Sequence, residues 1–318
     1  MVRWRNRSPA PDAAAVDGTR RTAGRVGMFH VKHKQMFHVK RQGQHGAIMD
    51  VSRETSTRAG WLWSPGASRA GTTKRKAPDG DPEEREGELP MKIVVFGATG
   101  MIGSRITAEA VHRGHQVLAV SRSGAAPVPG AVVTAGDASD PERVRELAAG
   151  ADAVISAVAP PRDGSDPGEA FLAVNVALAE GVSAAAATTP GPATGPGAGR
   201  LVVVGGAASL EVAPDRPLVE EEGFPEAYRP EALAQQDVLW FYRDIDDPGL
   251  DWTYISPAPE IGPGERTGHY RIGGDTLLTA EGAGGSHASR ISAEDFAVAV
   301  VDEAEQHRHP RTRISVAY

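Results

Sequence analysis

Short apolar runs alternate with longer amphipathic stretches along residues 91–318. The apolar runs have the length and the β-branched content of buried parallel strands. They lie at residues 92–96, 116–120, 153–157, 201–204, 252–256 and 313–317, and one further strand ends at Gly136-Asp137. Helical periodicity follows the glycines after the first strand and returns at residues 171–180, 231–242 and 293–305. Strands that alternate with helices predict an α/β fold with a doubly wound parallel sheet.

A stretch rich in alanine, threonine, proline and glycine interrupts this alternation at residues 183–199. Low complexity of this kind is typical of segments that need no packed core. We expect a frayed helix end followed by a flexible surface loop. The remaining pattern is continuous, so residues 91–318 are predicted to form a single domain.

Residues 1–90 lack any sustained helical or alternating pattern and are rich in arginine, proline, serine and glycine. We expect a disordered, basic extension. Its one feature is an internal repeat, in which Met-Phe-His-Val-Lys occurs at residues 28–32 and again at 36–40. Three interpretations are open: a basic arm that binds nucleic acid, a histidine-rich metal tract, or translated non-coding DNA. The histidines of such a tract are His30, His33, His38 and His45.

We favour the translated DNA, because Phe-His-Val-Lys can be encoded by TTTCACGTGAAA, which is its own reverse complement. A palindrome is a property of DNA, and this one resembles the site bound by chromosome-partition proteins of the ParB family. Met91, directly before the first strand, is then the expected true start. In the alternative, the extension is a solvated tail with weak affinity for polyanions.

Composition narrows the class of protein. Cysteine is absent from all 318 residues, which excludes disulfides and thiolate metal sites and suits a reducing cytoplasm. Residues 1–90 carry 17 Lys and Arg against 10 Asp and Glu, whereas residues 91–318 carry 17 Lys and Arg against 31 Asp and Glu. The larger segment is therefore acidic, which disfavours nucleic-acid binding. We see no export signal and no apolar run near the ~20 residues that span a bilayer. We expect a cytoplasmic protein with a small-molecule partner, without nucleic acid or membrane, and composition leaves its oligomeric state open.

A glycine-rich turn joins the first strand to the first helix. Its sequence is Gly97-Ala98-Thr99-Gly100-Met101-Ile102-Gly103. Glycines at this spacing let the backbone turn sharply, approach a pyrophosphate closely and pack the helix against the sheet. The N–H groups and the dipole of the helix N-terminus favour the same anion. The strand-turn-helix context therefore predicts a dinucleotide site of Rossmann type, and the alternative is a tight structural turn in another α/β fold.

The end of the second strand carries Ser121-Arg122-Ser123, where an enzyme that prefers NAD usually has an acid for the ribose 2′-hydroxyl. Arg122 can pair with a 2′-phosphate, so we predict a preference for NADPH of roughly ten- to a hundredfold. The alternative is a solvated surface arginine. After the third strand, Asp137 either meets the adenine amino group or caps the helix that begins near Asp140.

A series of short motifs runs through the domain in order. They are Val-Phe-Gly-Ala-Thr-Gly, Ser-Arg-Ser, Gly-Asp, Val-Ile-Ser-Ala, Val-Val-Val-Gly-Gly, Trp-Thr-Tyr-Ile-Ser-Pro-Ala and Gly-Glu-Arg-Thr-Gly-His-Tyr-Arg-Ile-Gly-Gly-Asp. This order resembles the NAD(P)H-binding atypical short-chain dehydrogenases, which include biliverdin reductase B-like flavin reductases and NmrA-like regulators, over essentially all of residues 91–318. The resemblance implies a cofactor site formed by Gly97, Thr99, Gly100, Met101, Ile102, Gly103, Arg122, Asp137, Ala157, Val158 and Pro257, with Ala258 beside Pro257 at the nicotinamide end.

Classical members of this superfamily use a Tyr-x-x-x-Lys pair in which the lysine lowers the pKa of the tyrosine. That pair is missing, because Lys92 is the only lysine after Met91 and Ala232 stands four positions after Tyr228. By the resemblance, Ser209 falls where the superfamily places its catalytic hydroxyl, and Tyr228 can donate a proton. A plain loop hydroxyl and a partly buried aromatic ring are equally open interpretations of these two residues.

A polar, glycine-rich segment after the sixth strand is expected to cross the mouth of the site as a substrate lid. Its polar members are Glu260, Glu265, Arg266, His269, Tyr270, Arg271 and Asp275. The only histidines of this region, His269 and His287, lack the spacing of metal ligands, so we expect no metal.

Three functions are compatible with these residues. The first is an NADPH-dependent oxidoreductase that reduces a flavin, a quinone or a similar small molecule by direct hydride transfer. The second is a noncatalytic NADPH-sensing regulatory or interaction protein. The third, an epimerase or dehydratase, is disfavoured by the missing lysine.

Overall fold

The computed structural model describes residues 73–76, 89–125, 128–162, 164–188, 199–280 and 289–318. The repeat at residues 28–40 and the histidines of the extension lie outside these ranges. Within the extension, for which we predict disorder, the structure has a short strand, β1 (Thr73–Lys76), which pairs antiparallel with β11 (His269–Gly273). The polar sequence of β1 did not indicate a strand.

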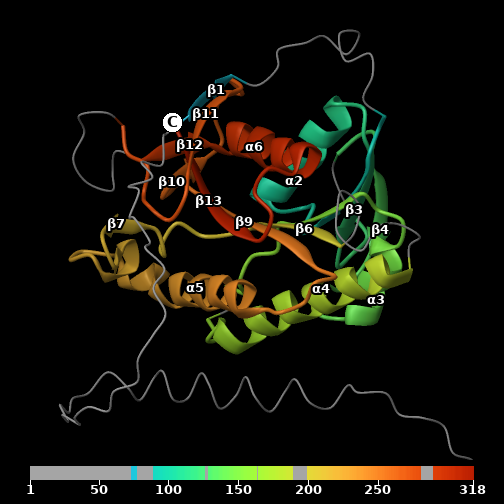
Figure 1. The fold of residues 1–318 in the computed structure, drawn as a ribbon, viewed down its shortest axis with the longest axis horizontal. Coiled ribbons are helices and arrows are strands. Elements are labelled where there is room, and N and C mark those ends of the chain that lie inside the picture. The colour runs from blue at the N-terminus through green and yellow to red at the C-terminus, as the bar shows by residue number, and fades with distance from the viewer. Residues whose placement is uncertain (1–72, 77–88, 126–127, 163, 189–198, 281–288) are drawn as a thin grey trace, which may run out of the picture. The chain divides into compact units, whose positions relative to one another are not determined.

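Nine strands form one sheet in the order β1-β11-β13-β9-β6-β5-β2-β3-β4 (Figure 1). Its parallel part consists of β2 (Lys92–Phe96), β3 (Gln116–Ser121), β4 (Val132–Ala135), β5 (Ala153–Ser156), β6 (Arg200–Val204), β9 (Asp251–Pro257) and β13 (Thr312–Ala317). Beyond β13, β11 pairs antiparallel with β13, and β1 pairs antiparallel with β11. Every strand predicted within residues 91–318 is present, and the doubly wound parallel sheet confirms the predicted fold class.

Two layers of helices cover the sheet (Figure 1). The helices α2 (Met101–His112) and α6 (Ala293–Gln306) pack together on one face. The other face carries α3 (Pro141–Ala148), α4 (Gly168–Thr188) and α5 (Arg229–Asp244). Because the central strands are buried on both faces, they are continuous apolar runs, which is why the sequence pattern located them.

Several short elements were not predicted from the sequence. They are β7 (Glu211–Ala213), β8 (Arg216–Pro217), β10 (Glu260–Gly262), β12 (Arg290–Ser292), and the 3-10 helices η2 (Leu218–Glu220) and η3 (Glu226–Tyr228). Two or three residues are too few to show a period, so pairing with other segments decides their conformation.

Helix α4 corrects the expectation of a frayed helix end at residue 183. It continues to Thr188, so residues 183–188 are helical rather than frayed, whereas 189–198 lie outside the described residues. Ala185 is buried in the core, and Gly181 packs closely against Val144 of α3, which stabilises the alanine-rich end. Within the described part of the chain, α4 is also the one helix whose length and hydropathy could cross a membrane. Its apolar residues pack on the sheet between α3 and α5.

Candidate functional site

The carboxyl ends of β2 and β5 meet at the point where the strand order reverses. β2 lies between β3, which follows it in the chain, and β5, which the chain reaches only after β4. The connections after β2 and β5 leave in opposite directions, so a crevice opens at the sheet edge where doubly wound folds bind ligands. The amide of Ala157 donates to the carbonyl of Phe96 (2.9 Å), which holds the two strand ends together.

The glycine turn lies directly in this crevice. Gly97 has a φ of +78°, and its amide donates to the carbonyl of Val120 at the end of β3 (3.1 Å). A Cβ at Gly97 would stand 2.6 Å from the carbonyl oxygen of Ala157, and a Cβ at Gly103 would overlap the carbonyl of Gly97. Both glycines are therefore required by close backbone approach, as the fingerprint spacing predicts.

The amino end of α2 has no side-chain cap. Gly100 stands at the N-cap, and the first turn contains no acidic residue. The unpaired N–H groups and the helix dipole at this end can therefore meet an anion. Around them Thr99 and Met101 are exposed and Ile102 is half-buried. The backbone cradle and the uncapped helix together fit the pyrophosphate of a dinucleotide.

The side of the crevice over β3 and β4 carries Arg122 and Asp137, both exposed. One carboxylate oxygen of Asp137 accepts hydrogen bonds from the amide and the hydroxyl of Ser139 (2.9 and 2.8 Å). These bonds, and more weakly the charge of Arg122, hold the pKa of Asp137 below its ordinary value. Asp140 caps α3 by accepting from two amides, at 3.1 and 3.3 Å, so helix capping is not the role of Asp137.

The opposite side, over β5, β6 and β9, receives the remaining predicted residues. Val158 is half-buried after β5, and Pro257 is buried at the end of β9. Ser209 lies in the loop after β6, where its carbonyl accepts from the buried Arg313 (3.3 Å). Tyr228 is the residue before α5 and is 65% exposed. No hydrogen bond joins the hydroxyls of Ser209 and Tyr228, both of which lie in the described part of the chain.

An ion pair on this side was missed by the sequence reading. The guanidinium of Arg162, in the loop after β5, contacts both carboxylate oxygens of Glu231 in the first turn of α5 (2.8 and 3.0 Å). The partners are 69 residues apart in the chain, and neither stands in a motif. A single arginine in a proline-rich loop gives no sequence signal, so only the fold brings this pair to the crevice.

The segment predicted as a substrate lid forms contacts with other parts of the fold. Arg266 pairs with Glu109 of α2 (2.8 Å), the buried Tyr270 donates to Asp302 of α6, and Asp275 pairs with Arg313 (2.6 Å). These contacts tie the segment to the α2–α6 layer and to β13, because its polar side chains found partners within the fold. The imidazole of His269 forms a hydrogen bond with the carbonyl of Thr267 (2.8 Å), and His287 lies outside the described residues.

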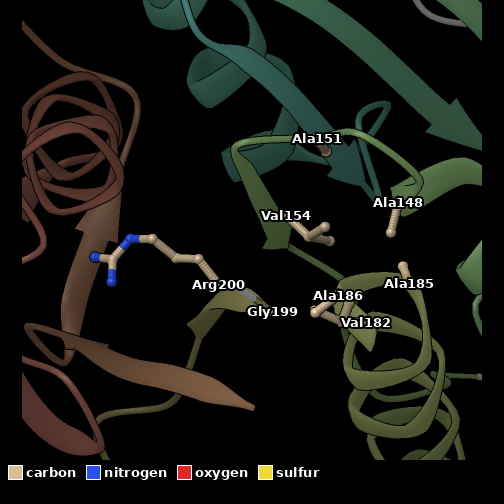
Figure 2. A pocket seen from close by; sticks show the side chains of 8 residues that line it. All are labelled: Ala148, Ala151, Val154, Val182, Ala185, Ala186, Gly199 and Arg200. Carbon is tan, nitrogen blue, oxygen red and sulfur yellow. The ribbon is translucent and has the colours of Figure 1, made fainter. Parts of the chain in front are cut away.

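No group of three or more histidine, cysteine, aspartate or glutamate side chains is arranged for a metal ion in the described part of the chain. A pocket lies at the opposite, amino ends of β5 and β6 (Figure 2). It is lined by Ala148, Ala151, Val154, Val182, Ala185, Ala186, Gly199 and Arg200. Figure 2 shows the guanidinium of Arg200 pointing away from it, so no charged group of the lining faces the pocket. The crevice at the carboxyl ends is therefore the better candidate.

Comparison with known proteins agrees with this choice. A family model described as NAD(P)H-binding matches residues 97–305. The uncharacterized protein YwnB of Bacillus subtilis (strain 168) is 35% identical over 232 residues, which cover 71% of this chain and 98% of YwnB.

Solved structures give the same result. A Burkholderia pseudomallei protein described as exported is 45% identical, with a TM-score of 0.59. The match covers 72% of this chain and 100% of that protein. A Streptococcus pneumoniae protein described as an NADH-flavin reductase is 32% identical, with a TM-score of 0.56. The match covers 71% of this chain and 99% of that protein. A Bacteroides thetaiotaomicron protein described as an epimerase is 33% identical, with a TM-score of 0.60. The match covers 72% of this chain and 98% of that protein.

Proposed function

The chain belongs to the NAD(P)H-binding family of atypical short-chain dehydrogenases, and from this premise we propose that it is an NADPH-dependent oxidoreductase. The proposed substrate is a flavin, a quinone or a similar conjugated small molecule, which is reduced by direct hydride transfer. The observation that carries the proposal is the backbone cradle at Gly97 and Gly103 beside the uncapped amino end of α2.

The preference for NADPH rests on the end of β3. Arg122 is exposed there, and the adjacent serines can donate hydrogen bonds to a 2′-phosphate. No carboxylate stands within Ser121-Arg122-Ser123 to receive a ribose 2′-hydroxyl or to repel a phosphate. Asp137 lowers the positive potential near Arg122, so the preference depends on how far the arginine extends over the ribose.

The substrate class follows from the missing lysine. Lys92 begins β2, at the amino end of the sheet and therefore opposite the crevice, so it cannot activate Tyr228. When bound, the nicotinamide supplies a hydride, which an electron-poor ring can accept without a strong acid from the protein. The chain has then only to align and shield the reacting rings, and the buried Pro257 and Ala258 exclude water at this end of the crevice.

A noncatalytic NADPH sensor is the alternative, and one observation favours it. Tyr228 is exposed, and no described residue forms a hydrogen bond with its hydroxyl. Such a protein would bind NADPH tightly and report it by a change of conformation. An epimerase or dehydratase is less well supported, because these enzymes need the activated tyrosine.

Titration of the protein with NADPH and with NADH, followed by nicotinamide fluorescence, tests both proposals. Flavin and quinone acceptors are then added, and oxidation is followed by absorbance. NADPH-preferring binding with turnover supports the reductase, and tight binding without turnover of any acceptor supports the sensor. Absence of binding for both nucleotides would overturn the assignment of the crevice.

The cytoplasm is the proposed compartment, because it holds NADPH and because the chain has no cysteine to oxidise. The only partner proposed is the small-molecule substrate, with neither nucleic acid nor a membrane involved. Fractionation of cells that express the tagged protein checks the compartment, and recovery in the membrane pellet would contradict it.

A further inference from the structure

The Arg162–Glu231 pair spans the substrate half of the crevice. Arg122 and Asp137 place the adenosine half over β3 and β4, so the nicotinamide half must extend over β5, β6 and β9. Arg162 comes from the carboxyl end of β5, and Glu231 opens α5, whose amino end faces the same edge of the sheet. Their bidentate contact joins the two connections that border the nicotinamide half.

This pair is suited to exchange partners. The side chain of Arg162 is 73% exposed, and exposed ion pairs contribute only about 0–1 kcal/mol to stability. Arginine presents a planar fork that matches phosphate and carboxylate oxygens equally well. An anion on a substrate can therefore replace Glu231 at little cost to the fold.

The other arginines of this side are committed elsewhere. Arg229 pairs with Glu226 (2.9 Å), donates to the carbonyl of Val219 (2.8 Å) and lies over the ring of Phe224. Arg313 is buried in β13 and is held by Asp275. Arg162 remains an arginine of this side whose partner is exchangeable.

An aromatic side chain stands beside this arginine. Tyr228 precedes Glu231 by three residues and exposes 65% of its surface, which offers a face for a planar ring. Glu231 first, and Tyr228 more weakly, raise the pKa of Arg162, which agrees with their closeness. Tyr228 and Arg162 are thus close enough to contact the ring and the anionic group of one substrate.

We propose that Arg162 is the anion anchor of the substrate site, and that Glu231 is a built-in competitor which the substrate displaces. The substrate class is a planar, electron-poor ring that carries a phosphate or a carboxylate. This inference rests on the proposed reductase function and narrows it.

Flavin mononucleotide and riboflavin test the anchor, because they share one ring system and differ by a phosphate. Binding to the full chain in the presence of NADP⁺ is measured by quenching of flavin fluorescence, and turnover with NADPH is measured separately. The wild type is expected to bind flavin mononucleotide about tenfold or more tighter than riboflavin. Arg162→Gln should abolish this difference and leave riboflavin binding unchanged, whereas Glu231→Gln should increase it.

Arg145→Gln is the matched control, since Arg145 forms an exposed pair with Glu142 on α3, remote from the substrate half. It should behave as the wild type toward both flavins. Equal binding of the two flavins by the wild type, or equal weakening of both in Arg162→Gln, would overturn the anchor. A quinone with a carboxylate and its methyl ester repeat the comparison for the second anion. Failure of every acceptor to be reduced, with NADPH still bound, would contradict the reductase instead.

Discussion

The two halves of the crevice are built in different ways. The cofactor half, over β2, β3 and β4, is shaped by backbone, above all by the positive φ of Gly97 and its close approach to Ala157. The proposed substrate half, over β5, β6 and β9, carries residues from separate loops, namely Ser209, Tyr228 and Arg162. Backbone geometry tolerates few substitutions, whereas exposed side chains can change with the substrate while the fold persists.

The supports of the two halves differ in the same way. Beneath the cofactor half, the guanidinium of Arg113 is 1% exposed and contacts Glu109, Asp302 and Glu305 at 2.6–2.7 Å, which ties α2 to α6. In the substrate half, the Arg162–Glu231 pair is open to water. Breaking a buried pair is far more costly than breaking an exposed one. We therefore expect losses of stability in the first half and changes of specificity in the second.

The largest effect is expected from Gly97→Ala. The new Cβ meets the carbonyl of Ala157, and alanine resists the positive φ, so the free energy of unfolding should fall by about 3 kcal/mol and NADPH binding should be lost. Gly114→Ala isolates the strain, because Gly114 also has a positive φ but open space around it, and it should cost about 1–2 kcal/mol. Urea unfolding and fluorescence titration measure both. Equal losses in the two variants would contradict the close-approach role of Gly97.

Glu109→Gln probes the buried support through pH. Burial alone would raise the pKa of Glu109, but the hydrogen bond from Arg266 and the charge of Arg113 lower it from 4.5 to about 2. A lowered pKa means that the carboxylate stabilises the fold above pH 4.5 and that this contribution is lost as the pH falls toward 2. The variant should be about 3 kcal/mol less stable than the wild type at pH 7.

The difference between Glu109→Gln and the wild type should shrink between pH 4.5 and pH 2 in urea unfolding. Glu142→Gln, at the exposed pair on α3, is the control and should leave stability almost unchanged at every pH. A constant difference across the acid range would show that Glu109 acts by packing rather than by charge.

Arg122→Gln tests the specificity of the cofactor half at its rim. Loss of one charge-assisted contact should weaken NADPH binding by roughly ten- to a hundredfold and leave NADH binding unchanged. Arg122→Lys keeps the charge without the fork and should give an intermediate result. Titration with both nucleotides decides the matter, and parallel weakening of the two would show that Arg122 does not contact a 2′-phosphate.

The smallest effects are expected from the two hydroxyls of the substrate half. Tyr228→Phe and Ser209→Ala should each lower the rate of flavin reduction by less than about tenfold, because the acceptor needs no strong acid. Single-turnover oxidation of NADPH measures this rate. A fall of about a hundredfold or more in either variant would identify that hydroxyl as a proton donor.

Local pattern was sufficient for much of the cofactor half. β2, the glycine turn and the start of α2 are contiguous, so their apolar run, glycine spacing and helical period could be recognised together. Arg122 could be placed at the crevice for the same reason, because it follows the next strand directly. The end of α4 was misjudged, because its alanines resemble low complexity until the fold shows that Ala185 belongs to the core.

By itself, the sequence determined the parallel sheet, the alternation of strands and helices along the chain, and a glycine turn whose geometry is set within a few residues. Only the tertiary structure decided that the expected lid pairs with α2 and β13, that Asp140 rather than Asp137 caps α3, and that Arg162 meets Glu231. The reason is physical: hydrogen-bonded turns and strand periods are local, whereas an ion pair 69 residues apart exists only after the sheet has brought its two loops to one edge.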